Sequence, residues 1–210
     1  MPRRRVVTAG QRIFATWYEM LDRIVAGRLE PYRRKTAGRA WGDVLEIGGG
    51  TGANLPYFSL ETRLTVVEPN PHMAVRLRAK AARQGRDVFV LPGIGEKLPF
   101  QDISFDCVVT TLMLCMAQDM HQVIREVRRV LRPGGAFLFY EHVASSNPRM
   151  RRWQRRVNPL WRFWTTGCNL DRDITAAINS AGFRSVDVSS FDLSVGLPLT
   201  IPNIIGVARA

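Results

Sequence analysis

At 210 residues, of which 46% are hydrophobic, the chain is long enough to bury one sizeable core and falls within the range of a single domain. No apolar run approaches the roughly 20 residues of a membrane-spanning helix. No long apolar segment follows the basic residues 1–5 either, so we expect no transmembrane helix and no secretory signal peptide. The formal net charge of +12 favours acidic partners such as nucleic acid, anionic lipid or anionic ligands. It does not choose among them, and an arginine-rich proteome produces the same excess without functional meaning.

The predicted elements alternate between short apolar strands and amphipathic helices along the chain. The first half contains helical residues 11–35, a strand at 44–47, the start of a helix at 54–58, a strand at 64–68, a helix at 71–84 and strands at 88–91 and 105–112. The second half contains a helix at 120–131, a strand at 136–140, an Arg- and Trp-rich segment at 145–170, a helix at 173–181 and strands at 186–191 and 204–208. This alternation predicts an α/β sheet with helices on both faces.

A glycine-rich turn follows the first predicted strand, in the run VLEIGGGTG at 44–52. Glycine permits positive φ and lets a ligand lie against the backbone, and ligands bind at the carboxyl ends of parallel strands. Glu68 ends the second strand 20 residues after Gly48, where an acid can accept hydrogen bonds from a ribose diol. The single residue between Gly50 and Gly52 differs from the GxGxxG spacing of nicotinamide enzymes, and no GK[ST] phosphate loop is present. The pattern therefore favours S-adenosylmethionine (SAM) as the cofactor.

Five sequence blocks resemble the class I SAM-dependent methyltransferases in their order. They are LEIGGGTG at 45–52, VVEPNP at 66–71, GEKLPF at 95–100, SFDCVV at 104–109 and LRPGG at 131–135. The resemblance implies a Rossmann-like fold, with a seven-stranded, mostly parallel sheet in the order 3-2-1-4-5-7-6 and the last-numbered strand antiparallel. The segments GGGTGANLPYF, TLMLCM and GCNLDRD are most similar to the small-molecule thiol methyltransferase group. A broader likeness extends to ubiquinone/menaquinone and lipid methyltransferases.

The resemblance also implies roles for individual residues. Around the methionine part of SAM it places Glu46, Gly48, Gly50 and Gly52; on the ribose, Glu68; around the adenine, Pro69, Asn70, Gly95 and Glu96; and beside the sulfonium, Thr111, Leu112 and Cys115. Many relatives carry an aspartate where this chain has Ile94, which can only pack against the adenine ring.

His142 directly follows the fifth predicted strand, at the same sheet edge as the glycine loop. A histidine there can act as a general base near neutral pH, or it can be a hydrogen-bonded structural residue. The three cysteines, Cys107, Cys115 and Cys168, have the spacing of neither a CxxC metal site nor a disulfide framework. We therefore expect reduced thiols, a cytoplasmic location, ordinary packing for Cys115 and Cys168, and no metal site.

We expect a single methyltransferase domain over residues 1–210. It would comprise an N-terminal helical cap at 1–40, a SAM-binding core at 41–143, an Arg- and Trp-rich insertion at 144–170, and a C-terminal helix and strands at 171–210. The run RMRRWQRR at 149–156 and the aromatic residues after it fit three roles: a cap over the acceptor pocket, a helix on an anionic membrane surface, or a nucleic-acid contact. The NPPY motif of nucleic-acid amino methyltransferases is missing after the fourth strand, where the chain reads TTLML, so nucleic acid is the least favoured partner.

The expected reaction is methyl transfer to a small hydrophobic acceptor, at a thiol sulfur or at a phenol or quinol oxygen. The predicted acceptor wall consists of Leu112, Met113, Cys115, Trp161 and Phe163. Two alternatives remain at this point: N-methylation of a phospholipid amine, and SAM binding without catalysis. The sequence carries no signal for the oligomeric state.

Overall fold

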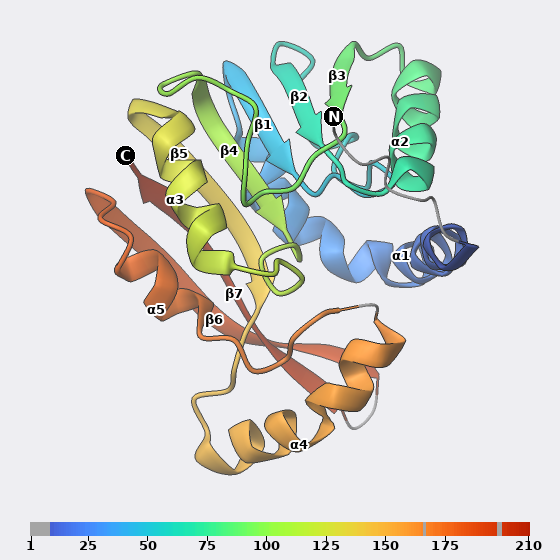
Figure 1. The fold of residues 1–210 in the computed structure, drawn as a ribbon, viewed down its shortest axis with the longest axis vertical. Helices are drawn as coiled ribbons and strands as arrows, with labels where there is room; N and C mark the ends of the chain where they lie inside the picture. Colours follow the sequence, from blue (N-terminus) through green and yellow to red (C-terminus); the bar gives the residue numbers. More distant parts are fainter. Residues whose placement is uncertain (1–8, 166, 197–198) are drawn as a thin grey trace, which may run out of the picture.

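The computed structural model describes residues 9–165, 167–196 and 199–210, so the basic residues 1–5 lie outside the described part of the chain (Figure 1). The strands are β1 (Asp43–Ile47), β2 (Arg63–Val67), β3 (Val88–Leu91), β4 (Phe105–Thr111), β5 (Leu131–His142), β6 (Ser185–Gly196) and β7 (Leu199–Arg209). The helices are α1 (Ala9–Lys35), the short 3-10 turn Ala37–Arg39, α2 (Pro71–Arg83), α3 (Met120–Val130), α4 (Pro148–Trp164) and α5 (Ile174–Asn179).

The strands form one sheet in the order β3-β2-β1-β4-β5-β7-β6. The first five strands in this order are parallel to one another, and β7 is antiparallel to both β5 and β6. This confirms the predicted class I methyltransferase topology. Because β1, β2, β4 and β5 run in one direction, the segments that follow them gather at a single sheet edge.

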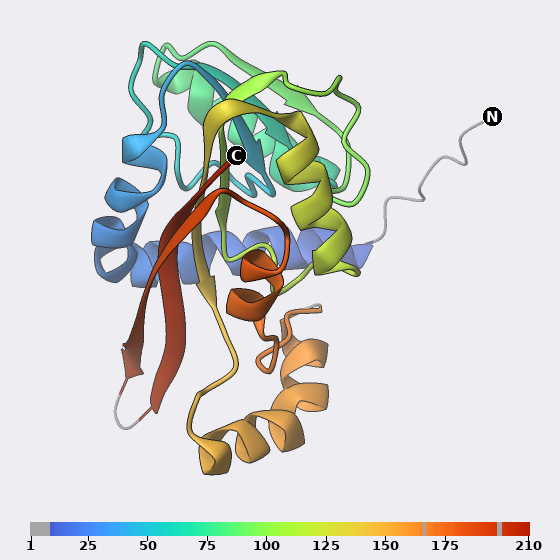
Figure 2. The ribbon, with the colours of Figure 1, turned by 90° about the vertical axis from the view of Figure 1, so that its left-hand side faces the viewer.

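Helices cover both faces of the sheet, as the alternation predicts. One apolar cluster joins the central strands to α3 and α5, through residues such as Val123, Val127 and Ile178. A second cluster on the other face contains Leu77 of α2 and the segment around Leu55. The helix α1 lies across the carboxyl ends of the central strands, while α4 and the outer part of the β6–β7 hairpin extend away from the main body (Figure 2).

Polar side chains begin four of the helices at well-defined positions. Asn70, Asp119, Asn147 and Asp173 each accept a hydrogen bond from a backbone amide in the first turn of the helix that follows. Proline is the first residue of both α2 and α4, where its missing amide proton leaves no hydrogen bond unmade. These caps explain why α2, α3 and α5 start at or within one residue of the predicted positions 71, 120 and 173.

The predicted helix start at 54–58 is wrong. This segment is a chain of turns, in which the amides of Gly52, Leu55 and Tyr57 each bond to the carbonyl three residues earlier. Gly50 and Gly52 both have positive φ, and Pro56 disfavours helical backbone at the residue before it. The strands β6 and β7 are also longer than predicted, because pairing across their hairpin continues beyond its apolar centre. Strand β5 is longer because Leu131 pairs with β4 at one end and His142 pairs with β7 at the other. No helix in the described ranges is long and apolar enough to span a membrane.

Candidate cofactor and acceptor site

A cavity of about 510 Å³ opens at the carboxyl ends of β1, β2 and β4. Its wall combines the glycine loop after β1, the segment after β2, the segment around Ile94 and the loop after β4. Four further lining residues, Gly10, Gln11, Phe14 and Tyr18, come from α1. The predicted ligand-binding edge of the sheet therefore holds a pocket with α1 along one side.

Two glycines of the loop have backbone conformations that other residues rarely adopt. Gly48 has φ of 75° and Gly50 has φ of 56°. A Cβ atom at Gly48 would lie 2.4 Å from Cγ of Met113, which is far inside van der Waals contact. The absence of a side chain thus lets the backbone after β1 approach the loop after β4. The amides of Gly48 and Gly50 bond to the carbonyl of Val67 and to the carboxylate of Glu68, respectively.

The carboxylate of Glu68 joins the glycine loop to the segment after β2. One oxygen accepts a 2.8 Å hydrogen bond from the amide of Gly50, and the other accepts one of the same length from the amide of Asn70. Glu68 is only 4% exposed, and this burial raises the pKa of its carboxyl group despite the two amide donors. Since a carboxylate has about four acceptor positions, the group retains capacity for hydroxyl donors in the cavity.

The wall provided by α1 was missed from sequence. Gln11, Phe14 and Tyr18 follow one another at spacings of three and four residues, so they share one helix face. That spacing was visible in the sequence, but nothing in it showed that this face meets the cavity and not the core. The carbonyl of Gln11 accepts a hydrogen bond from the side chain of Asn70, which fixes the start of α1 beside the end of β2. The environment of Tyr18 raises its pKa to about 12, mainly through burial, so it keeps its phenolic proton.

Nine of the twelve residues predicted around SAM line this cavity: Gly48, Gly50, Glu68, Pro69, Asn70, Gly95, Glu96, Thr111 and Leu112. Glu46, Gly52 and Cys115 do not line it. A Cβ at Gly52 would lie 2.7 Å from Cδ1 of Leu55, so this glycine is required for packing of the turn. Ile94 also lines the cavity, together with Met73, Met116 and Gln118, which the sequence did not single out.

Glu46 lies buried behind the glycine loop. One of its carboxylate oxygens accepts a 2.7 Å hydrogen bond from the side-chain amide of Asn54, and the other has no partner in the described structure. Asn54 in turn bonds to Thr111 and accepts a 2.7 Å hydrogen bond from the guanidinium of Arg33 on α1. Burial raises the pKa of Glu46 to about 7. This network ties β1, β4 and α1 together beneath the cavity.

Glu141, near the end of β5, positions the opposite wall. One of its carboxylate oxygens accepts hydrogen bonds from the amides of Met113 and Leu114, at 3.1 and 3.0 Å. Leu112, just before them, has φ of 54°, a strained value for a leucine. The loop after β4 is therefore held in one conformation by a buried acid, and burial raises the pKa of that acid to about 7.

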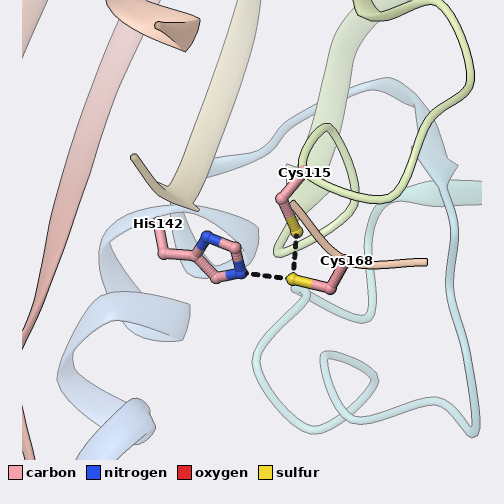
Figure 3. Close-up of side chains that lie close together, drawn as sticks. All are labelled: Cys115, His142 and Cys168. Atoms are coloured by element: carbon pink, nitrogen blue, oxygen red, sulfur yellow. Dashed lines mark hydrogen bonds between the residues drawn. The ribbon is translucent and has the colours of Figure 1, made fainter. Parts of the chain in front are cut away.

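His142, Cys115 and Cys168 come together at the end of β5 (Figure 3). The Nε2 atom of His142 lies 2.8 Å from Sγ of Cys168, and Sγ of Cys168 lies 3.5 Å from Sγ of Cys115. All three side chains are buried, and none of them lines the large cavity. The contact with Cys115 lowers the pKa of the Cys168 thiol, with a further contribution from His142. The sequence spacing predicts no such cluster, because its members lie 26 and 27 residues apart along the chain.

The predicted acceptor wall is divided in the structure. Leu112 and Met113 line the large cavity, whereas Cys115 is buried behind it. Trp161 lines a second, smaller cavity of about 80 Å³ between α4 and the β6–β7 hairpin. The side chain of Phe163 is 77% exposed, so its assignment to the wall is wrong. The side chain of Trp164 lies outside the described part of the structure.

The cavity has the shape and chemistry that SAM requires. Glycines without side chains line it after β1, an acid lies at the end of β2, and an apolar rim contains Phe14, Ile94 and Met73. The volume lies within the range of small-molecule sites.

Comparisons with known proteins agree with this geometry. A family model described as a methyltransferase domain matches residues 45–139. The chain is 35% identical over 170 residues to the human thiol S-methyltransferase TMT1A, covering 79% of this chain and 69% of that protein. It is 33% identical over 120 residues to the phosphatidylethanolamine N-methyltransferase of Cereibacter sphaeroides, covering 55% of this chain and 59% of that protein.

A solved structure shares the fold. The YcgJ protein of Bacillus subtilis superimposes with a TM-score of 0.73 at 19% identity, covering 87% of this chain and 97% of that one. At this identity the likeness shows the architecture alone.

Proposed function

This chain belongs to the class I SAM-dependent methyltransferases, and we propose that its acceptor is a small hydrophobic thiol, methylated on sulfur. The similarity to a thiol S-methyltransferase over 79% of the chain carries this proposal. It covers a larger part of the chain than the methyltransferase family model, which matches residues 45–139.

We assign the cofactor contacts from the cavity. The free acceptor positions of Glu68 suit the two ribose hydroxyls, and the backbone at Gly48 and Gly50 suits the methionine part. Ile94 offers an apolar surface for the adenine ring, with Gly95 and Glu96 at its edge. Bound SAM supplies a methyl group on a sulfonium, which leaves readily without an acid. Glu46 and Gly52 support this arrangement from behind the loop.

The acceptor side of the cavity is apolar. Leu112, Met113 and Met116 lie on the loop after β4, and Phe14 approaches from α1. Such a wall favours an apolar acceptor and leaves few fixed charges to recognise a polar metabolite. A thiol has a pKa near 8.5, so a few per cent is already thiolate near pH 7. A phenol or quinol, with a pKa near 10, needs firmer help from a base.

His142 does not face the cavity, since its Nε2 atom points to Cys168. We therefore propose that His142 acts through the Cys168 thiol, as a positioning residue, and does not itself remove the acceptor proton.

We also propose peripheral contact with an anionic membrane surface. One face of α1 exposes the apolar side chains of Ile13, Trp17, Met20, Leu21 and Ile24. On α4, exposed Trp153, Leu160 and Phe163 lie among arginines. Apolar side chains beside cations are the pattern of helices that lie in a membrane interface. Helix α4 retains its alternative role as a cap over the acceptor.

A comparison of acceptors tests the proposed reaction. Initial rates of methyl transfer from labelled SAM are measured with an alkyl thiol, a quinol and a phospholipid amine at equal concentrations. We expect the thiol to react fastest. Transfer to the phospholipid amine alone would overturn the choice of sulfur, and no transfer to any acceptor class would favour SAM binding without catalysis.

A further inference from the structure

The cluster of Cys115, His142 and Cys168 presents two sulfur atoms and one ring nitrogen to a common point. Each residue offers one ligand atom, and these three atoms lie within 4.8 Å of one another. They come from three separate segments: the loop after β4, the end of β5 and the segment after α4 (Figure 3). The parallel order of β4 and β5 brings the first two to one edge, and the chain returns from α4 to add the third.

The spacing of these atoms is close to that of a tetrahedral metal site. With bonds of about 2.3 Å to sulfur and about 2.0 Å to nitrogen, tetrahedral ligands lie about 3.5–3.8 Å apart. The observed separations are 3.5 Å between the two sulfurs and 2.8 Å between Cys168 and His142. The separation between the ligand atoms of Cys115 and His142 is also within 4.8 Å. To hold an ion, the His142 ring would have to move away from Cys168, to about 3.5 Å from each sulfur.

The surroundings also suit a cation with soft ligands. The three side chains are at most 8% exposed, which excludes competing bulk water. Two thiolates neutralise a divalent ion, so the filled site carries no net charge and costs little to bury. Cys115 is held in place by contacts of its own: its Sγ lies 3.4 Å from the carbonyl of Leu112, and its carbonyl accepts two hydrogen bonds from Asn169.

We propose that Cys115, His142 and Cys168 bind one thiophilic divalent metal ion, Zn²⁺. Three protein ligands leave a fourth tetrahedral position free, as in zinc sites that bind a substrate or water. The residues around Cys115 in the sequence, Leu112, Met113 and Met116, line the large cavity. The metal site therefore lies directly behind the acceptor wall.

This location gives the ion a role that rests on the proposed function. None of the three ligands lines the cavity, so an acceptor thiol reaches the fourth position only when the side chains between the cavity and the cluster move aside. There it would lose its S–H proton to solvent and be held as a metal thiolate, because a thiol that coordinates zinc is deprotonated outright. The ion would thus keep the acceptor sulfur as a thiolate, which is the nucleophile in methyl transfer. It would also explain why His142 points to Cys168.

The test uses the whole purified chain under a phosphine reductant that contains no thiol. Metal content is measured after incubation with Zn²⁺ and dialysis, and Co²⁺ is added in parallel because its thiolate charge-transfer bands report sulfur ligands. We expect one metal ion per chain and strong charge-transfer absorption. Cys115→Ser, Cys168→Ser and His142→Asn should each weaken Zn²⁺ binding at least tenfold, and the two serine variants should each lose part of the charge-transfer absorption.

Cys107→Ser is the matched control. Cys107 is equally buried, but it lies on β4 with its sulfur near the amide of Trp41, away from the cluster. It should retain full metal binding. Calorimetric SAM binding by each variant shows that the chain is folded.

Two outcomes would overturn the metal site. One is a reduced wild-type chain that binds SAM but retains no Zn²⁺ and shows no charge-transfer bands. The other is a Cys115–Cys168 disulfide in the purified protein together with the absence of metal binding after reduction. The role in thiol binding has its own readout, because an alkyl thiol should intensify the Co²⁺ charge-transfer bands without SAM. Unchanged bands would reject that role and leave the metal site standing. Metal binding without methylation of any thiol would instead reject the proposed acceptor.

Discussion

The amide of Gly50 donates a 2.8 Å hydrogen bond to the carboxylate of Glu68, which connects the glycine loop of β1 to the end of β2. Both residues are among the cofactor contacts predicted from the sequence, and this hydrogen bond shows that they also hold each other in place. A substitution at either position changes the shape of the loop as well as its contacts with SAM.

Replacement of Glu68 should weaken SAM binding more than the loss of ribose contacts alone. Glu68→Ala leaves the buried amides of Gly50 and Asn70 without acceptors, which adds to the lost hydroxyl contacts. We expect a loss of about 1–3 kcal/mol in binding free energy, measured by calorimetry. Glu61→Gln, at an exposed position in the turn before β2, is the control and should bind SAM normally. Unchanged affinity in Glu68→Ala would contradict the assigned cofactor contacts.

The cavity face of α1 should contribute to SAM binding through packing. Phe14→Ala removes an aromatic side chain that lines the cavity, whereas Ile13→Ala removes an adjacent side chain that is 69% exposed. We expect Phe14→Ala to raise the Kd for SAM at least tenfold and Ile13→Ala to leave it within about twofold, since about 1.4 kcal/mol corresponds to a factor of ten. Equal effects of the two substitutions would show that α1 does not close the site.

The sequence predicts the strands and the cofactor edge well, because each depends on local signals. A short apolar run followed by glycines marks β1, and an Asn-Pro pair marks the start of α2. The segment 54–58 was misjudged because its helical composition competes with positive-φ glycines on one side and Pro56 within it.

The Cys115–His142–Cys168 cluster could not be predicted from spacing, since the three residues meet only through the order of β4 and β5 in the sheet. The same holds for the α1 wall. Gln11, Phe14 and Tyr18 share one helix face by their spacing, and only the fold shows that this face meets a cavity.

Glu46 should make the stability of the SAM-free enzyme depend on pH. Its folded pKa is about 7, above the ordinary value of 4.5, because burial disfavours the charged form. The folded state therefore holds its proton more tightly than the unfolded state. Stability from this group is complete below about pH 4.5 and is lost as the pH rises through about 7.

Glu46→Gln should remove this part of the pH dependence while its amide oxygen can still accept from Asn54. Denaturant unfolding at pH 5 and pH 8 measures the effect. The wild type should lose up to about 3 kcal/mol more than the variant between these pH values. Parallel stability curves for the two proteins would mean that Glu46 is not the group that titrates.

Contact with anionic membranes should depend on both arginines and exposed apolar residues. The double variant Arg152→Gln, Arg155→Gln removes two exposed charges from α4, and Trp17→Ser with Ile24→Ser removes apolar side chains from α1. We expect wild-type protein to cosediment with anionic vesicles and each double variant to bind less, with the α4 effect suppressed by salt. Negligible wild-type binding to both neutral and anionic vesicles would reject membrane contact and leave α4 as a cap.

Gly48 allows the glycine loop to lie close to Met113. A double-mutant cycle can separate the steric cost of a side chain at Gly48 from the cost of its backbone strain. Gly48→Ala places Cβ 2.4 Å from Cγ of Met113 in a backbone with φ of 75°, so it suffers both a clash and backbone strain. Gly85→Ala is the matched control, because φ there is 61° but nothing lies within 4 Å of the new atom. We expect losses in unfolding free energy of about 2–4 kcal/mol at Gly48 and about 1 kcal/mol at Gly85.

Met113→Ala removes the clashing Cγ, so the double variant Gly48→Ala, Met113→Ala should be more stable than the sum of the single effects predicts, by about 1 kcal/mol or more. The strain from positive φ should remain in that double variant. Strict additivity, or equal losses at Gly48 and Gly85, would show that the loop after β4 moves aside freely and that the wall of the cavity is not held by Glu141.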